Sequence, residues 1–310
     1  MTALVCGSLA YDHIMVFPDH FRNHILPDKI HILNVCFVVP EMQREFGGCA
    51  GNIAYNMKLL GADGIPMATA GKDFDSYRQH LDALGIDCRH IKVIDDAYTA
   101  QCFITTDLDD NQITSFQIGA MGRAHENKVA DADGISIGIV APDGKDGMLQ
   151  HARQFAEAGI PFFFDPGQNI PILGKDELLD AFGHANWLIF NDYEWQMVEN
   201  KTGLNTRSVL DSVEALIVTR GAEGSYVYTA KKQYEIPPAK VAVVNDPTGC
   251  GDAYRAGLLH GLMQDMDWET TGRIASLIGA IKIEQHGTQN HTVTPQEFAD
   301  RFKQNFGYAC

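Results

Sequence analysis

The segment that most constrains the fold is the glycine-rich passage at residues 246–252, which reads DPTGCGD. The apolar run before it, residues 241–244, predicts a buried strand, and small and apolar residues recur after it at helical spacing to about Met263. Glycines at the start of a helix leave backbone N–H groups unpaired, and the helix dipole makes that position favourable for anions. Asp252, placed there, is consistent with a general base beside a bound phosphoryl group or with a simple first-turn carboxylate.

Strand and helix patterns alternate along most of the chain, which predicts an α/β fold with a mainly parallel sheet flanked by helices. Apolar strands are expected at residues 4–9, 65–69, 135–141, 162–165, 187–190, 215–218 and 225–228. Helices are expected at residues 74–84, 144–158, 251–263, 270–285 and 295–305.

Two stretches interrupt the alternation. Residues 14–42 show no helical pattern and include the β-favouring run 35–39, while residues 98–106 and 112–118 read as two strands joined by a polar turn. Residues from about 13 to 45 and from about 97 to 120 are therefore predicted to form a small β-sheet lid. This lid would fold over the larger part of the domain, in which strands and helices alternate. No linker rich in Gly, Pro or Ser separates the parts, so residues 1–310 are predicted to form a single domain.

Composition narrows the class of protein. The 310 residues are 45% hydrophobic, enough for one large core with a modest appendage. A formal net charge of −16, from 24 basic and 40 acidic residues, argues against a nucleic-acid or anionic-membrane partner. No segment approaches about 20 uninterrupted apolar residues. The seven cysteines lack any C-x-x-C spacing, so we expect a reduced, cytoplasmic protein.

Three further segments join the 246–252 passage. FGGCAGNIAYN at residues 46–56 opens an amphipathic helix, whereas NDYE at 191–194 and TRG at 219–221 each follow an apolar strand. Loops at the carboxyl ends of parallel strands meet at one edge of a sheet, so these segments are expected to form one site. Together, and in this order, they resemble the ribokinase family of carbohydrate and nucleoside kinases, and the resemblance covers nearly the whole chain.

The resemblance implies a ribokinase-like fold and ATP-dependent phosphoryl transfer. Asp252 would be the general base, and the backbone N–H groups of Gly249, Cys250 and Gly251 would form an anion hole for the transferring phosphoryl group. The family usually has Thr and Ala where this chain has Pro247 and Cys250. Because proline lacks an N–H group, the detailed geometry of this loop is expected to differ from that of relatives.

The nucleotide side of the site is implied by two loops. Asn191 and Glu194 match the family's N-x-x-E element, which organises Mg²⁺ around the ATP phosphates, often through water. The same two residues also fit a capping box at a helix start, and both roles are compatible. Thr219 and Gly221 would line the phosphates or ribose of the nucleotide.

A second cation site is also implied. Asp246 and Thr248, with carbonyl groups of residues 285–291, correspond to the position where relatives hold a monovalent cation such as K⁺. Arg255 follows Asp252 by about one helical turn, so it is predicted to face the site.

The acceptor side is implied by the N-terminal motifs. Asp12 corresponds to the family carboxylate that accepts hydrogen bonds from two vicinal sugar hydroxyls, and Gly47, Gly48 and Asn52 would belong to the same pocket. Relatives that phosphorylate phosphosugars often carry Lys after the paired glycines, where this chain has Cys49. We therefore expect an uncharged small-molecule acceptor, a nucleoside or a sugar.

The choice between a nucleoside and a sugar as acceptor depends on the sequence of residues 46–56, which is similar to that of bacterial adenosine kinases. It predicts phosphorylation of the adenosine 5′-hydroxyl to give AMP. Phe17, Phe37, Phe103 and Phe116 of the lid would offer surface for a purine, although core packing of the small sheet explains most of these rings equally well. A sugar kinase of the ribokinase or fructokinase type stays open, as does a non-catalytic nucleoside or sugar sensor on the same fold. Exposed edges of the lid strands are compatible with a homodimer.

Overall fold

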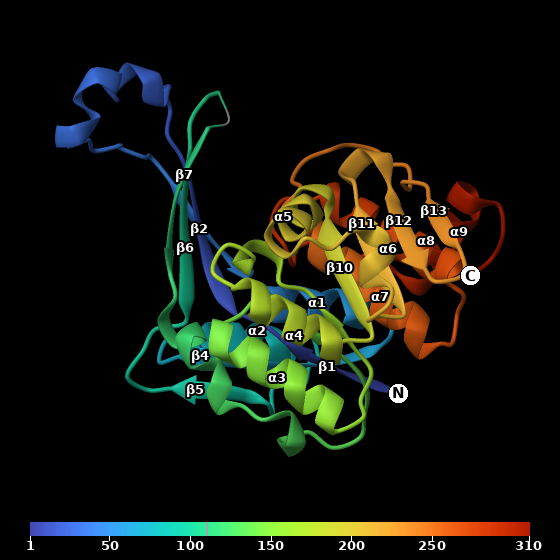
Figure 1. Ribbon diagram of the computed structural model, residues 1–310. Coiled ribbons are helices and arrows are strands. Elements are labelled where there is room, and N and C mark those ends of the chain that lie inside the picture. Colours follow the sequence, from blue (N-terminus) through green and yellow to red (C-terminus); the bar gives the residue numbers. More distant parts are fainter. Residues whose placement is uncertain (110) are drawn as a thin grey trace.

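The computed structural model describes residues 1–109 and 111–310, which form two β-sheets and the helices around the larger one (Figure 1). The strands of the larger sheet are β1 (Thr2–Cys6), β4 (Asp63–Gly71), β5 (Ile91–Ile94), β8 (Ile135–Val140), β9 (Phe162–Phe164), β10 (Trp187–Asn191), β11 (Ala215–Thr219), β12 (Ser225–Thr229) and β13 (Gln233–Ile236). The smaller sheet contains β2 (Ala10–Val16), β3 (Met42–Gly47), β6 (Ala100–Thr106) and β7 (Gln112–Gln117). The α-helices are α1 (Cys49–Leu59), α2 (Asp75–Ala83), α3 (Lys145–Glu157), α4 (Lys175–His184), α5 (Asp192–Thr202), α6 (Thr206–Val209), α7 (Cys250–Met263), α8 (Trp268–Ile283) and α9 (Pro295–Phe306).

The larger sheet has the strand order β13-β12-β11-β10-β9-β8-β1-β4-β5. Neighbouring strands from β5 to β11 are parallel, and β12 and β13 add an antiparallel edge. Helices α1, α2, α7 and α8 pack on one face and α3 to α6 on the other, which explains why the central strands are apolar throughout. The predicted arrangement, a mainly parallel α/β sheet with a small lid sheet, is confirmed.

The lid sheet has the order β3-β2-β6-β7 and projects from the body in Figure 1. Opposed residues on paired strands share a face of the sheet. Tyr11 and Phe46 share one face and pack against Tyr77 of α2, so this face is joined to the body. Asp12, the next residue along β2, therefore lies on the opposite face.

One predicted strand is wrong, and one β-favouring run forms no strand. Residues 241–244 have no strand pairing and lie at the surface, where Val241 is 41% exposed and Val244 is 64% exposed. The sheet ends at β13, and the segment runs along the end of α8 instead, where the N–H of Ala242 donates to Oε1 of Glu284 at 2.8 Å. Residues 35–39 are also irregular, and Phe37 packs instead on Phe17 and Phe21.

Some elements were not predicted. The edge strands β5 and β13 and the helix α4 have no counterpart in the sequence-based assignment. The segment before β3 also contains two short 3₁₀ helices, Phe21–Asn23 and Pro27–Ile32, where no helix was expected. Among the helices that the structure describes, none has the length and apolar character that crossing a membrane requires.

Candidate active site

Asp252 lies in the first turn of α7, beside a residue of α1. Gly249 is the N-cap and has a φ of 78°, a left-handed conformation that glycine adopts without strain. Helices α1 and α7 pack together, and Nδ2 of the buried Asn52 donates a hydrogen bond to Oδ2 of Asp252 at 2.8 Å. This contact leaves the other carboxylate oxygen, Oδ1, without a bond from Asn52. The structure therefore brings Asn52, predicted for the acceptor pocket, into direct contact with the predicted base.

The orientation of the Asn52 amide is fixed by a buried hydrogen-bond chain. Gln289 donates from Nε2 to Oδ1 of Asn52 at 2.9 Å and to the hydroxyl of Tyr77 at 2.7 Å. The Tyr77 hydroxyl in turn donates to the carbonyl of Gly47 at 2.8 Å. Because Oδ1 of Asn52 faces Gln289, its Nδ2 must face Asp252. Neither Gln289 nor Tyr77 was predicted, since nothing in the sequence pairs residues this far apart.

The surroundings of Asp252 set its protonation. Burial raises the pKa of the carboxyl to about 6, although the Arg255 guanidinium and the hydrogen bond from Asn52 oppose the shift. At neutral pH the group is thus mainly ionised, with a pKa much nearer to 7 than that of an ordinary aspartate. A general base works best in this range.

Asp12 lies within strand β2 of the lid sheet, between β3 and β6. It faces the glycine pair, because a Cβ atom built on Gly47 would lie 2.3 Å from Oδ2 of Asp12. Only glycine leaves room for the carboxylate here. Burial, followed by the charges of Asp252 and Glu45, raises the pKa of Asp12 to about 6. Gly48 caps the start of α1, so the predicted acceptor residues gather around one point beside Asp252.

The N-terminus of α7 offers backbone donors to an anion, though not all those predicted. The N–H of Cys250 donates to the carbonyl of Pro247 at 3.2 Å, and so it is already engaged. The N–H groups of Gly251 and Asp252 belong to the first turn and have no carbonyl within the helix to receive them. Burial raises the pKa of the Cys250 thiol to about 11, which keeps it neutral.

The predicted nucleotide loops lie side by side at the carboxyl ends of β10 and β11, where Asn191 is paired with Thr219. Asn191 Oδ1 accepts from the N–H of Glu194 at 2.7 Å, and Glu194 Oε2 accepts from the N–H of Asn191 at 2.8 Å. This is the capping box foreseen from the sequence. Gly221 begins the next turn with a φ of 54°.

The oxygen atoms of this loop suit a hydrated Mg²⁺. Glu194 keeps Oε1 free of the capping box, and carboxylate oxygen is a preferred ligand of Mg²⁺. Burial and the charge of Asp165 raise the pKa of Glu194, so a nearby cation would favour its ionised form.

Arg255 joins the two halves of the site. Its guanidinium makes two hydrogen bonds to Asp165, which directly follows β9, and the pair is inside the protein, with side chains 11% and 1% exposed. Although burial opposes it, the charges of Asp165, Asp252 and Glu194 raise the pKa of Arg255. Asp165 was not predicted as a site residue. Its only sequence signal is a position at the end of a predicted strand.

Comparison with known proteins agrees with this geometry. Residues 11–295 match the family described as pfkB family carbohydrate kinase. The chain belongs to the pfkB family. A nucleoside kinase of Methanocaldococcus jannaschii is 31% identical over 274 residues, which cover 88% of this chain and 90% of the relative.

Solved structures give the same assignment. The structure of Burkholderia thailandensis nucleoside kinase in complex with inosine matches this chain with a TM-score of 0.91 at 46% identity, covering 99% of both chains. The same kinase in complex with ADP-inosine matches with a TM-score of 0.89 at 47% identity, covering 99% of this chain and 97% of the other. The predicted ribokinase-like fold of this pfkB-family kinase is thereby confirmed.

The position predicted for K⁺ in this pfkB-family kinase contains a side-chain cation. Lys282 of α8 is fully buried, and its Nζ donates to the main-chain carbonyl of Asp246 at 2.7 Å. Carbonyl and carboxylate oxygens at this position are therefore already in contact with a positive charge. The residues present do not fit an additional monovalent cation there.

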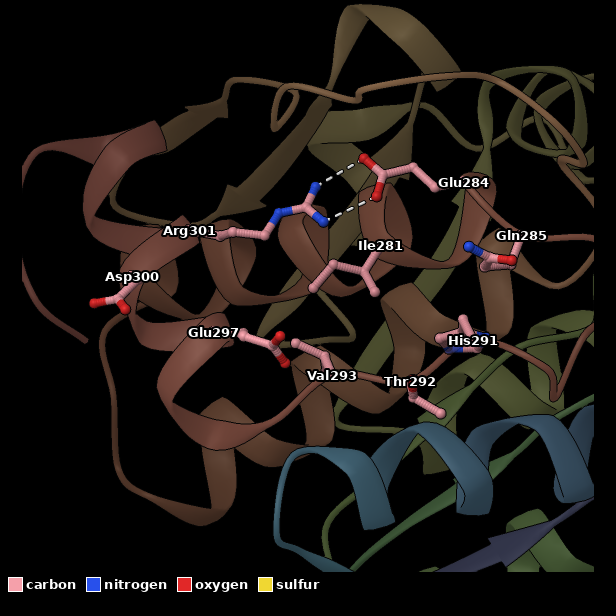
Figure 2. Close-up of a pocket in the computed structure, with 9 residues that line it drawn as sticks. All are labelled: Ile281, Glu284, Gln285, His291, Thr292, Val293, Glu297, Asp300 and Arg301. Atoms are coloured by element: carbon pink, nitrogen blue, oxygen red, sulfur yellow. Dashed lines mark hydrogen bonds and ion pairs between the residues drawn. The ribbon is translucent and has the colours of Figure 1, made fainter.

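A separate cavity of about 290 Å³ lies where the end of α8 meets α9 (Figure 2). Its lining residues are Ile281, Glu284, Gln285, His291, Thr292, Val293, Glu297, Asp300 and Arg301. Of these, only Gln285 and His291 belong to a predicted site, since they bound the segment 285–291 whose carbonyl groups were predicted to hold K⁺ in this pfkB-family kinase. The Arg301 guanidinium binds both carboxylate oxygens of Glu284, at 2.8 and 2.9 Å, so the cavity wall is fixed by an ion pair.

Proposed function

We propose that this pfkB-family kinase uses ATP to phosphorylate the 5′-hydroxyl of purine nucleosides, adenosine among them. The observation that carries the proposal is the position of Asp12 and Asp252. One carboxylate lies on the lid strand and the other at the N-terminus of α7, near enough that the charge of Asp252 contributes to the raised pKa of Asp12. The hydrogen-bond chain that runs from Gly47, beside Asp12, through Tyr77 and Gln289 to Asn52 also ends on Asp252, so one acceptor molecule can contact both carboxylates. The nucleoside kinases of Methanocaldococcus jannaschii and Burkholderia thailandensis support the same substrate class.

The face of the lid that carries Asp12 also offers apolar surface. Cys102 is opposite Asp12 on β6, and Phe116 is opposite Cys102 on β7, so these side chains share a face. Ile14 and Ile104 are paired one step further along the same face. A nucleobase attached to the ribose held by Asp12 would contact these groups, whereas a free sugar would not extend to them.

The other lid aromatics have different neighbours. Phe103 stacks on His13 at a ring separation of 4.5 Å, on the opposite face of the sheet. Phe17 and Phe37 pack against each other at 4.9 Å. Of the four lid phenylalanines named from the sequence, Phe116 is the one that supports a purine contact.

The proposed transfer proceeds by attack of the 5′-hydroxyl oxygen on the γ-phosphorus while the bond to the departing ADP oxygen breaks. The hydroxyl proton passes to Oδ1 of Asp252, since Oδ2 accepts from Asn52. The N–H groups of Gly251 and Asp252 donate to the transferring phosphoryl group. Asp12 accepts from the 2′- and 3′-hydroxyls and thereby orients the ribose.

The negative charge of the ATP phosphates has to be neutralised by groups at the site itself. The chain carries a net charge of −16, so its overall field repels ATP. Glu194 and Asn191 would hold Mg²⁺ through water, and the ion would neutralise phosphate charge when bound. On the acceptor side, burial raises the pKa of Cys49 and keeps it neutral, in agreement with an uncharged acceptor.

The decrease of kcat/KM at low pH is expected to depend on Asp252 and Asp12. Burial raises the pKa of both carboxyls to about 6, and each must be ionised for its role, Asp252 to take the hydroxyl proton and Asp12 to accept from both vicinal hydroxyls. We therefore expect kcat/KM to fall as the pH decreases through 6 and to be constant above about pH 7.5. Two required ionisations give a limiting slope of about two log units per pH unit, against about one for Asp12→Asn. A wild-type profile that stays flat down to about pH 5 would contradict the assignment.

ADP release with adenosine, inosine, ribose and fructose as acceptors tests the proposal directly. We expect turnover with both nucleosides, at a kcat/KM above that for either sugar. Faster turnover of ribose or fructose would instead identify a sugar kinase. Nucleoside binding, measured by calorimetry, without any ADP release would identify a sensor.

A further inference from the structure

Lys282 is a buried lysine that the proposed transfer does not use. In addition to the 2.7 Å bond to the Asp246 carbonyl, its Nζ donates to the carbonyl of Gln285 at 3.3 Å and lies 3.6 Å from Oδ2 of Asp246. Two carbonyls and one carboxylate thus surround the ammonium group. These are the kinds of oxygen atom that would otherwise coordinate a monovalent cation.

The hydrogen bonds around the carboxylate of Asp246 favour its ionised form beside the Lys282 ammonium. Its Oδ1 accepts from the N–H of Thr248 and its Oδ2 from the N–H of Gly287, both at 2.9 Å. Burial opposes ionisation of Asp246, but these amides and the Lys282 charge outweigh it and lower its pKa. The buried positive charge is therefore compensated without any bound ion.

We propose that the Lys282 ammonium takes the place of the monovalent cation expected at Asp246 and Thr248, so that this kinase needs no K⁺. An ammonium group is close to K⁺ in size, and a second cation among the same oxygen atoms would be repelled. The inference does not depend on which nucleoside or sugar is the acceptor.

The tethered ammonium has a positioning role. Asp246 begins the loop that leads to Gly251 and Asp252, and Lys282 ties the carbonyl of Asp246 to the end of α8. That end is itself held, because Arg301 of α9 binds Glu284 (Figure 2). Lys282 therefore fixes the loop whose amides face the phosphoryl group, without touching the substrate.

The first test compares wild-type protein in potassium, sodium and tetramethylammonium chloride at equal ionic strength. We expect the turnover to differ by less than about twofold and the Tm by less than about 1 °C among the three salts. A wild-type Tm or turnover that rises specifically with K⁺ would overturn the proposal. Because the Tm needs no substrate, this result stands even if the acceptor has been misassigned.

The second test is Lys282→Met, which keeps most of the stem and removes the ammonium. Turnover without K⁺ is expected to fall by about 10²-fold, since the loop amides lose their anchor. Added K⁺ is expected to increase the turnover of this variant at least about tenfold and to raise its Tm by about 2–4 °C. A folded variant with wild-type turnover in every salt would refute the role of Lys282. Should it not fold, the wild-type comparison alone decides.

Lys201→Met is the matched control. Lys201 of α5 is partly buried and also donates from its ammonium to carbonyls, those of Ile170, Pro171 and Leu173, at 2.6, 3.2 and 2.7 Å. Its loss is expected to lower the Tm but to create no response to K⁺. Rescue of both variants by K⁺ would show a general salt effect and would overturn the proposal.

Discussion

Replacement of Asp252 by asparagine is expected to lower kcat by about 10²–10⁴-fold, because the amide cannot take the proton of the attacking hydroxyl. The KM for the nucleoside is expected to change by less than about threefold, since the ribose is held by Asp12 and not by the base. The variant is expected to remain folded. Burial raises the pKa of Asp252 to about 6, so folding disfavours its charge, and a neutral amide removes that cost at neutral pH. Steady-state kinetics with adenosine or inosine and a thermal melt measure both effects.

A matched control for this variant is Asp75→Asn. Asp75 is also a carboxylate in the first turn of a helix, α2, but it has no place in the site. Loss of such a carboxylate is expected to lower stability by less than about 1 kcal/mol and to leave kcat unchanged. If Asp252→Asn behaves like Asp75→Asn, then Asp252 is a simple first-turn carboxylate and the proposed mechanism fails.

The order of strands and helices was largely predictable because periodic apolar patterns are local. Helix α7 and the strands β10 and β11 appear close to their predicted bounds. Residues 241–244 show the limit of this reasoning, because Val241, Val243 and Val244 form an apolar run and yet lie exposed without pairing to any strand. Apolar character alone does not provide a pairing partner, and only the complete sheet decides which runs are paired.

The site was predictable only in part, for a related reason. The glycine loops and Asp252 are visible in the sequence because they occur at strand ends and helix starts. The contacts that orient them join distant segments: Gln289 is 237 residues from Asn52, and Arg255 is 90 residues from Asp165. Lys282 is a further example, since a lysine on an apolar helix shows its role only when its carbonyl partners are known. Such pairings follow from the fold and have no local pattern.

The ion pair between Arg255 and Asp165 leads to the second large prediction. Arg255→Met is expected to lower the free energy of unfolding by about 3–5 kcal/mol, because it leaves the enclosed carboxylate of Asp165 without its counter-charge. Urea denaturation at neutral pH measures the change. Arg153→Met is the matched control, since Arg153 also makes two hydrogen bonds to one aspartate, Asp180, but the pair is 53% and 42% exposed. Loss of this exposed pair is expected to lower the free energy of unfolding by less than about 1 kcal/mol.

A double variant separates the loss of the pair from the loss of packing. Asp165→Asn combined with Arg255→Met removes both charges, so it is expected to be more stable than Arg255→Met alone. Arg255 also lowers the pKa of Asp252. Its removal is therefore expected to move the acid limb of kcat/KM to higher pH, a change that lost packing alone would not cause. If the double variant is no more stable and the limb does not move, Arg255 contributes through its volume, and its charge has no role in tuning the base.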